Sequence, residues 1–168
     1  MMNTDKYLND IDLTRFNAFL QGSTTTPTFH YVDNLPPLSE LFPDHVYYAI
    51  LFKKNIGTDI GHWVVLIKWD EQTYEYFDCL GTPAPQEVRD ILDDFSELTS
   101  LPIVLLESGR QLMAKNNFIC GKWVIFRLMT IPHSIKAFHN FIDVLTRGKK
   151  VRADDIVNFI VNIPFKEI

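Results

Sequence analysis

Apolar residues recur along the chain at two spacings, one typical of helices and one typical of strands. Helical spacing predicts amphipathic segments over residues 10–21, 85–95, 120–129 and 134–145, and a further helix beginning at residue 154. Runs rich in aromatic and β-branched residues predict strands over residues 46–52, 62–69 and 74–79, and a buried strand over residues 102–106. The three residues at 70–72 are few enough to join two of these strands as an antiparallel hairpin. This order predicts an α+β fold, with a small, mostly antiparallel central sheet packed by helices.

Single residues mark where several of these elements begin. Pro85 favours a helix start because its fixed φ suits the first helical turn, and Ser134 can cap the helix that follows it. Asp154 complements the positive end of the last helix. The helix that begins at Cys120 is apolar on most sides, as expected of a helix at the centre of a small domain. Residues 23–37 are rich in Thr and Pro, which predicts a surface loop.

The composition fits one folded domain. The 168 residues are 46% hydrophobic and 22% charged, the balance of an ordinary globular protein, so we expect a single domain over residues 1–168. The chain has 16 Lys and Arg against 21 Asp and Glu, and this net charge of −5 gives no general reason to bind nucleic acid. The N-terminal residues do not follow the pattern of a signal peptide, and no apolar run approaches the ~20 residues of a membrane span. We therefore expect a protein that is neither secreted nor in a membrane.

Several cofactor classes have no motif in this sequence. Neither a GxxxxGKS/T nor a GxGxxG run is present, which lowers the expectation of nucleotide chemistry. The two cysteines, Cys79 and Cys120, are too few for a disulfide framework and fit a reducing environment. A zinc site built from these two thiols and a histidine would lack every common ligand spacing, such as CxxC or HExxH. We therefore expect no cofactor and no metal.

Three side chains could act together as a nucleophile, a base and an orienting acid. His62 opens one predicted strand and Asp78 closes the strand that pairs with it, so a hairpin would bring both to one end of the sheet. Cys120 begins the apolar helix, where the partial positive charge of a helix N-terminus stabilises a thiolate. A cysteine sulfur beside His62 would complete a Cys-His-Asp arrangement for nucleophilic catalysis.

Each of these residues also has a structural interpretation. Cys120 could be a small buried residue of an apolar helix, His62 a half-exposed residue at a strand end, and Asp78 a turn residue. Cys79 alternates with Asp78 along the predicted strand, so we expect it to face the opposite side of the sheet and to be structural. The remaining histidines lack such neighbours and are expected to be structural or surface residues: His30, His45, His133 and His139.

Three short segments carry these residues: Gly61-His62-Trp63, then Tyr76-Phe77-Asp78 with Gly81 just after, then Cys120-Gly121 at the start of an apolar helix. As an ordered series, spread over residues 46–129, they resemble the adenovirus-type (adenain-like) cysteine endopeptidases and the related ubiquitin-like-protein (SUMO) proteases. The order His, Asp, Cys is part of the match, since papain-like enzymes have the cysteine first. The resemblance implies a cysteine-proteinase-like fold with the nucleophile at the N-terminus of a buried helix.

The resemblance also implies a role for each residue. Cys120 would be the nucleophile, His62 the general base and then the general acid, and Asp78 the group that holds the imidazole in its productive tautomer. Trp63 would pack over the site, although filling the core is an equal alternative.

The family also places a glutamine shortly before the nucleophile, where its amide helps to bind the oxyanion. Here Ala114 stands six residues before Cys120, which departs from the pattern of the cellular branch. The nearest upstream glutamine is Gln111, and we favour it for this role; Asn116 or Asn117 is the alternative donor.

By this resemblance we expect a viral cysteine endopeptidase that cleaves capsid or core precursor proteins through an acyl-enzyme intermediate. It would act as a monomer in the virion and in the cytoplasm or nucleus of the host cell. An activating peptide is left open, whereas the acidic balance argues against activation by DNA. Three alternatives remain: a deubiquitinase-like or SUMO-protease-like isopeptidase, a thiol acetyltransferase that uses coenzyme A, and a non-catalytic binding module.

Overall fold

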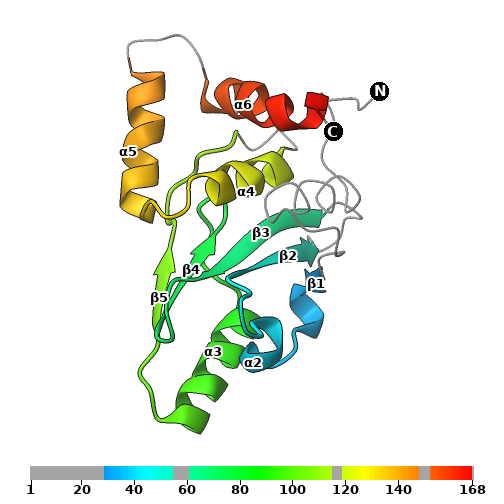
Figure 1. Ribbon diagram of the computed structural model, residues 1–168, viewed down its shortest axis with the longest axis vertical. Coiled ribbons are helices and arrows are strands. Elements are labelled where there is room, and N and C mark those ends of the chain that lie inside the picture. The colour runs from blue at the N-terminus through cyan, green and yellow to red at the C-terminus, as the bar shows by residue number, and fades with distance from the viewer. Residues whose placement is uncertain (1–28, 55–60, 115–118, 148–151, 168) are drawn as a thin grey trace. The chain divides into compact units, whose positions relative to one another are not determined.

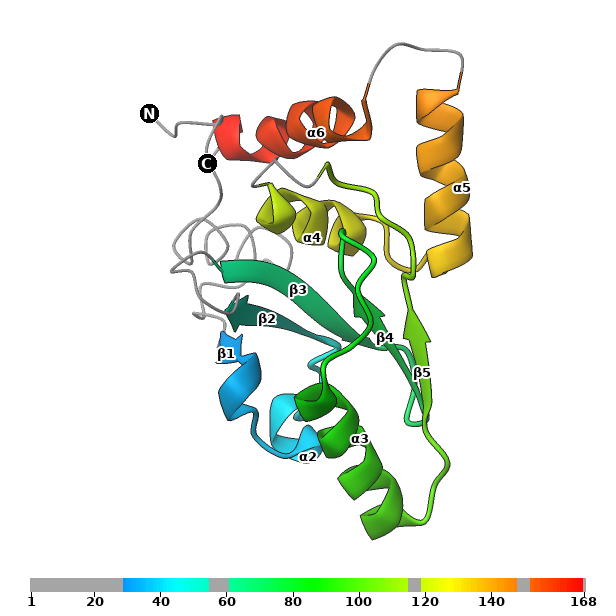
Figure 2. The same ribbon diagram turned by 180° about the vertical axis from the view of Figure 1, so that it is seen from behind.

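The computed structural model describes four stretches of the chain, residues 29–54, 61–114, 119–147 and 152–167. They fall in two compact units, one within Thr28–Arg110 and one within Gln111–Ile168. We call the first the sheet unit and the second the helical unit, and Figures 1 and 2 draw them from opposite sides. The helix predicted over residues 10–21 lies outside the described residues. A single domain over residues 1–168 stays a prediction.

The sheet unit is built on a five-stranded sheet with the order β1-β2-β3-β4-β5 (Figure 1). The strands are β1 (His30–Tyr31), β2 (Tyr48–Lys54), β3 (Gly61–Lys68), β4 (Thr73–Phe77) and β5 (Val104–Glu107). The three central strands pair antiparallel, and β3 and β4 form the expected hairpin. The outer strands pair in parallel, β1 with β2 and β5 with β4. The predicted α+β class with a central sheet is confirmed.

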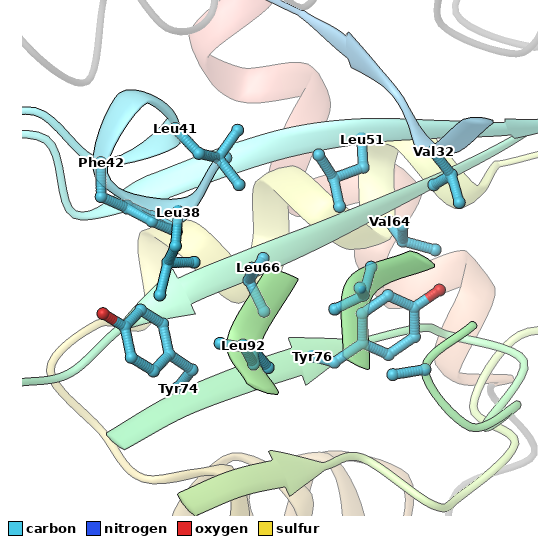
Figure 3. Close-up of a cluster of buried hydrophobic side chains, with 13 residues drawn as sticks. Val32, Leu38, Leu41, Phe42, Leu51, Val64, Leu66, Tyr74, Tyr76 and Leu92 are labelled. Carbon is cyan, nitrogen blue, oxygen red and sulfur yellow. The ribbon is translucent and has the colours of Figure 1, made fainter. Parts of the chain in front are cut away.

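One face of this sheet is covered by α2 (Leu38–Leu41) and α3 (Gln86–Thr99), with the short helix η1 (Val32–Asn34) beside them. Side chains alternate between the faces along a strand, so Val64 and Leu66 of β3 project to the same side. There they join one buried hydrophobic cluster with side chains of β2, β4 and the helices, as Figure 3 shows. The cluster consists of Val32, Leu38, Leu41, Phe42, Ala49, Leu51, Val64, Leu66, Tyr74, Tyr76, Ala84, Val88 and Leu92.

The helical unit contains α4 (Cys120–Met129), α5 (Ile135–Thr146) and α6 (Ala153–Glu167). Helices α4 and α6 run side by side in Figures 1 and 2 and pack against each other. Ser134 caps α5 as predicted, because its hydroxyl accepts a hydrogen bond from the backbone N–H of Ala137 at 3.1 Å. None of the helices in the described stretches combines the length and the apolar composition that crossing a membrane requires.

The edge strand β5 and the segment before β2 differ from the sequence prediction. The sequence predicts a buried strand over residues 102–106, whereas β5 lies at the sheet edge and leaves Val104 and Leu106 53% and 37% exposed. An edge strand has one neighbour, and only the face that carries Leu105 packs against the hydrophobic cluster. The described part of the predicted loop at residues 23–37 contains β1 and η1, because its backbone pairs with β2.

Gly61 lets an aromatic ring cross the start of β3, next to His62. A Cβ atom at Gly61 would overlap the ring of Phe52, which packs edge-on against Trp63 at a centroid distance of 4.8 Å. Gly61→Ala is therefore expected to destabilise the protein by about 1–3 kcal/mol, because the ring must leave this packing. Urea unfolding measures this cost, and a Phe52→Ala background should remove most of it. An equal cost in both backgrounds would show that the ring is not the cause.

Candidate active site

His62 and Asp78 meet at one end of the β3–β4 hairpin. Val65 pairs with Phe77 in the register of the two strands. Asp78 is the first residue after β4, and His62 lies near the start of β3, three residues before Val65. The His62 Nε2 atom lies 2.6 Å from Asp78 Oδ1, and both side chains are buried.

The Asp78 carboxylate accepts hydrogen bonds on both oxygens. Besides His62, the backbone N–H of Leu80 donates to Oδ1 at 2.8 Å, and the hydroxyl of Thr82 donates to Oδ2. These two donors belong to the turn after β4, in which Gly81 adopts a φ of 73° that residues with a side chain rarely take. The turn therefore fixes the orientation of the carboxylate toward His62.

The backbone of Asp78 is held by Ser108, the residue that follows the distant strand β5. The buried hydroxyl of Ser108 donates to the carbonyl oxygen of Asp78 at 2.9 Å and accepts from the Asp78 N–H at 3.3 Å. Beside it, Glu107 accepts from the backbone N–H of Ala84 at 2.7 Å and from the Arg89 guanidinium at 2.5 Å. The end of β5 thus supports the loop that follows β4 at both its beginning and its end.

The environment of Asp78 favours its ionised form. Burial raises the pKa of Asp78, but the hydrogen bond and charge of His62, followed by the donors Thr82 and Leu80, lower it below its ordinary value. Asp78 is therefore a carboxylate at neutral pH, which accepts from an Nε2 that carries hydrogen. An imidazole held in this way takes up or releases a proton through Nδ1, and the carboxylate stabilises the imidazolium that forms. The pair can act as a general base of fixed tautomer.

Cys79 does not lie where the sequence places it. The sequence predicts a strand through residue 79, with Cys79 on the face opposite Asp78, but β4 ends at Phe77 and Cys79 lies in the turn. The alternation of a strand therefore does not apply to it. The sulfur of Cys79, a ring nitrogen of His62 and a carboxylate oxygen of Asp78 all lie within 4.8 Å of one another, and the three residues are buried.

Cys120 is the first residue of α4, in the helical unit, and it is buried. The helix starts where the sequence predicts, and all its residues as far as Leu128 are buried. A thiol in the first turn lies near the positive end of the helix dipole, which favours a negative charge there. The catalytic role of Cys120, and its meeting with His62 and Asp78, stay predictions.

The start of α4 is anchored by α6. The buried carboxylate of Asp154 accepts from the indole N–H of Trp123 at 2.8 Å and from the backbone N–H of Ala114 at 3.0 Å. The ammonium group of Lys122, also buried, donates to Asn158 Oδ1 at 2.8 Å. Asp154 therefore ties α4 to the segment that precedes it in the chain.

Gln111 lies in this preceding segment with its side chain exposed. Its amide nitrogen donates to the carbonyl oxygen of Met113 at 3.1 Å. The alternative donors, Asn116 and Asn117, lie outside the described residues. The role of Gln111 as a donor to an oxyanion stays a prediction.

Trp63 has contacts that favour one of its two predicted roles. Its ring packs against the rings of Phe52 and Phe29 at centroid distances of 4.8 and 5.7 Å. Alternation along β3 also puts Trp63 on the face opposite His62. These contacts favour the packing role over that of a cover for the site.

The sequence analysis did not predict the supporting roles of Thr82 and Ser108. It placed Asp154 at the start of a helix but did not predict its hydrogen bonds to Trp123 and Ala114. Thr82 has a local signal, because a hydroxyl four residues after an aspartate in a glycine-containing turn can reach back to the carboxylate. Ser108 and Asp154 bind partners 30 and 31 residues away, and no local pattern indicates such pairs.

The fold is one that a viral protease also adopts. Two solved structures of the pS273R protease of ASFV are similar to this chain. One has a TM-score of 0.58 and 11% identity, and the match covers 95% of this chain and 69% of that chain. The other has a TM-score of 0.54 and 12% identity, with coverage of 95% and 68%. At these identities the likeness establishes the fold.

The sequence comparisons add one viral relative. The protein named "Uncharacterized protein V9" of Sputnik virophage is 25% identical over 122 residues, which are 64% of this chain and 67% of that protein. No protein-family model matches the chain. The expected protease fold is therefore supported, whereas the adenovirus-type branch in particular stays a prediction.

Proposed function

We propose that the protein is a viral cysteine endopeptidase whose catalytic triad is Cys120, His62 and Asp78. The observation that carries the proposal is the buried His62–Asp78 pair, with 2.6 Å between Nε2 and Oδ1 and an acid oriented by its own turn. Two findings support it further: Cys120 begins a buried helix, and the chain shares its fold with a protease of ASFV. The proposed substrates are capsid or core precursor proteins, which a monomer would cleave in the virion or the infected cell.

In the proposed reaction, the thiol proton of Cys120 passes to Nδ1 of His62, and the thiolate attacks the carbonyl carbon of the scissile peptide. His62 then returns this proton to the leaving amine as the C–N bond breaks, and the acyl group remains on the sulfur. A water molecule loses a proton to His62 and attacks the thioester, which releases the second product and restores the thiol. Asp78 stays ionised throughout and stabilises the imidazolium in both steps.

Gln111 is the proposed side-chain donor to the oxyanion. Its amide nitrogen carries two hydrogens, of which Met113 accepts one. For Gln111→Ala we expect kcat to fall by about 10²–10³-fold, because one oxyanion donor contributes roughly 2.7–4 kcal/mol in the transition state. The free energy of unfolding should hardly change, because the side chain is exposed. Steady-state kinetics measure this effect, with Gln72→Ala, a substitution of another exposed glutamine, as the control. An unchanged kcat for Gln111→Ala would show that Gln111 is not the oxyanion donor.

Mapping of new protein N-termini tests the proposed activity. The wild-type protein is coexpressed, under reducing conditions, with the structural proteins that the same viral genome encodes. The N-termini in this sample are compared with those in a sample that contains Cys120→Ala instead. The proposal predicts N-termini within capsid or core precursors that appear only with the wild type. Identical N-termini in both samples would contradict an endopeptidase.

A chemical probe distinguishes the isopeptidase alternative. A ubiquitin-like protein with an electrophile at its C-terminus labels the nucleophile of enzymes that remove such modifiers. An endopeptidase for capsid precursors should leave this probe unreacted. Covalent capture of the probe at Cys120 would instead favour an isopeptidase.

A further inference from the structure

The turn after β4 places a second thiol beside the His62–Asp78 pair. Cys79, His62 and Asp78 each offer one ligand atom, and these three atoms lie within 4.8 Å of one another. Each of the three residues is buried, and His62 comes from β3, whereas the other two come from the turn. The proposed peptide hydrolysis uses the imidazole and the carboxylate but has no role for the Cys79 sulfur.

An imidazole nitrogen, a carboxylate oxygen and a thiolate sulfur are the three ligand types that Zn²⁺ uses in proteins. Zn–N and Zn–S distances of roughly 2.0–2.3 Å put the ligand atoms of a tetrahedral site about 3.3–3.6 Å apart. The sulfur is within 4.8 Å of both partners, and the 2.6 Å between Nε2 and Oδ1 is short because a proton bridges them. A metal that replaces this proton requires side-chain shifts of about 1 Å.

The charges of this cluster also suit a buried divalent cation. The carboxylate of Asp78 and a thiolate of Cys79 together cancel the charge of Zn²⁺, and a buried site tolerates a neutral group far better than a charged one. On binding, the Cys79 thiol releases its proton to solvent. His62 loses the hydrogen on Nε2, takes up one hydrogen on Nδ1 and binds through Nε2, so it remains neutral.

Tyr76 supplies a second, independent observation at this place. It belongs to β4, two residues before Asp78 in the chain, and it is fully buried. Within the described stretches its hydroxyl has no hydrogen-bond partner. A phenol hydroxyl can donate a hydrogen bond to the oxygen ligand that completes the coordination of the metal.

We propose that His62, Asp78 and Cys79 form a zinc site in the sheet unit, in which the metal replaces the proton between the imidazole and the carboxylate. Bound zinc withdraws His62 from proton transfer. Zinc is therefore a reversible inhibitor of the enzyme, a consequence that rests on the proposed function, whereas the metal site itself does not.

Cobalt binding to the full-length Cys120→Ser variant tests the site directly. This variant keeps Cys79 as the single cysteine of the chain. Co²⁺ should bind in a 1:1 ratio and give the near-ultraviolet charge-transfer band of a cobalt–thiolate bond, and Zn²⁺ should abolish the band by displacement. Cys120→Ser combined with Cys79→Ser should show no band, and addition of His62→Gln or Asp78→Asn to Cys120→Ser should weaken binding at least tenfold.

Two results would overturn the site. One is the absence of a thiolate band in folded Cys120→Ser, with folding checked by circular dichroism. The other is a band of unchanged affinity in the His62→Gln and Asp78→Asn combinations, because Cys79 would then bind cobalt without these partners. All these variants lack the proposed nucleophile, and the measurement is cobalt binding and not hydrolysis. The result for the metal site therefore does not depend on whether the proposed function is correct.

Discussion

Cys120→Ser is expected to lower kcat/KM for peptide hydrolysis by about 10⁶-fold, the size of effect seen when the nucleophile of a catalytic triad is removed. The substitution replaces one atom at the first position of a buried helix. A serine hydroxyl in this place is a far weaker nucleophile than a thiolate, so the acyl-enzyme does not form. Hydrolysis of the substrate defined by the N-terminal mapping gives the rate.

The control for this variant lies at the other end of the same helix. Met129 is the last residue of α4 and is partly exposed, so Met129→Leu should keep wild-type activity. The free energy of unfolding of both variants, measured with urea, should match that of the wild type to within about 1 kcal/mol. Hydrolysis by Cys120→Ser within tenfold of the wild-type rate would mean that another residue is the nucleophile.

His62→Gln is expected to reduce kcat by on the order of 10⁴-fold or more. A glutamine amide can still donate to the Asp78 carboxylate, so the buried acid keeps a partner and the fold should persist. It cannot accept the thiol proton or return a proton to the leaving amine, and both steps therefore lose their catalyst. Single-turnover kinetics separate this loss from any change in substrate binding.

The matched control for this substitution is an exposed histidine. The side chain of His133 is exposed, in the segment between α4 and α5, and His133→Gln should leave kcat unchanged. Circular dichroism and urea unfolding show whether His62→Gln keeps its fold. If folded His62→Gln retained a tenth or more of the wild-type kcat, His62 would not be the general base.

The parts of the site that follow from local patterns could be predicted from the sequence. A short connection between two predicted strands brings His62 and Asp78 to one end of a hairpin, and the structure has this hairpin and this pair. The helix start at Cys120 could be predicted for a similar reason, because an apolar run that follows polar residues marks a buried helix.

Other parts of the site depend on contacts that no local pattern reveals. Strand alternation failed for Cys79 because β4 ends two residues earlier, and strand ends are the least predictable feature of an element. Ser108 reaches Asp78 only because β5 pairs in parallel with β4, a pairing across 30 residues of sequence. The exposure of Val104 likewise follows from the position of β5 in the strand order and not from its own apolar residues.

Cross-linking with 1,3-dibromoacetone tests the central claim, that the sulfur of Cys120 meets the imidazole of His62. This reagent joins a thiol to a neighbouring imidazole through a bridge of three carbons. In the Cys79→Ser variant Cys120 is the single thiol of the chain, so mass spectrometry can locate both ends of the bridge. The proposed triad predicts one cross-linked peptide pair that joins Cys120 to His62. Cys120 alkylated without a link to His62, or linked to a different histidine, would contradict the triad.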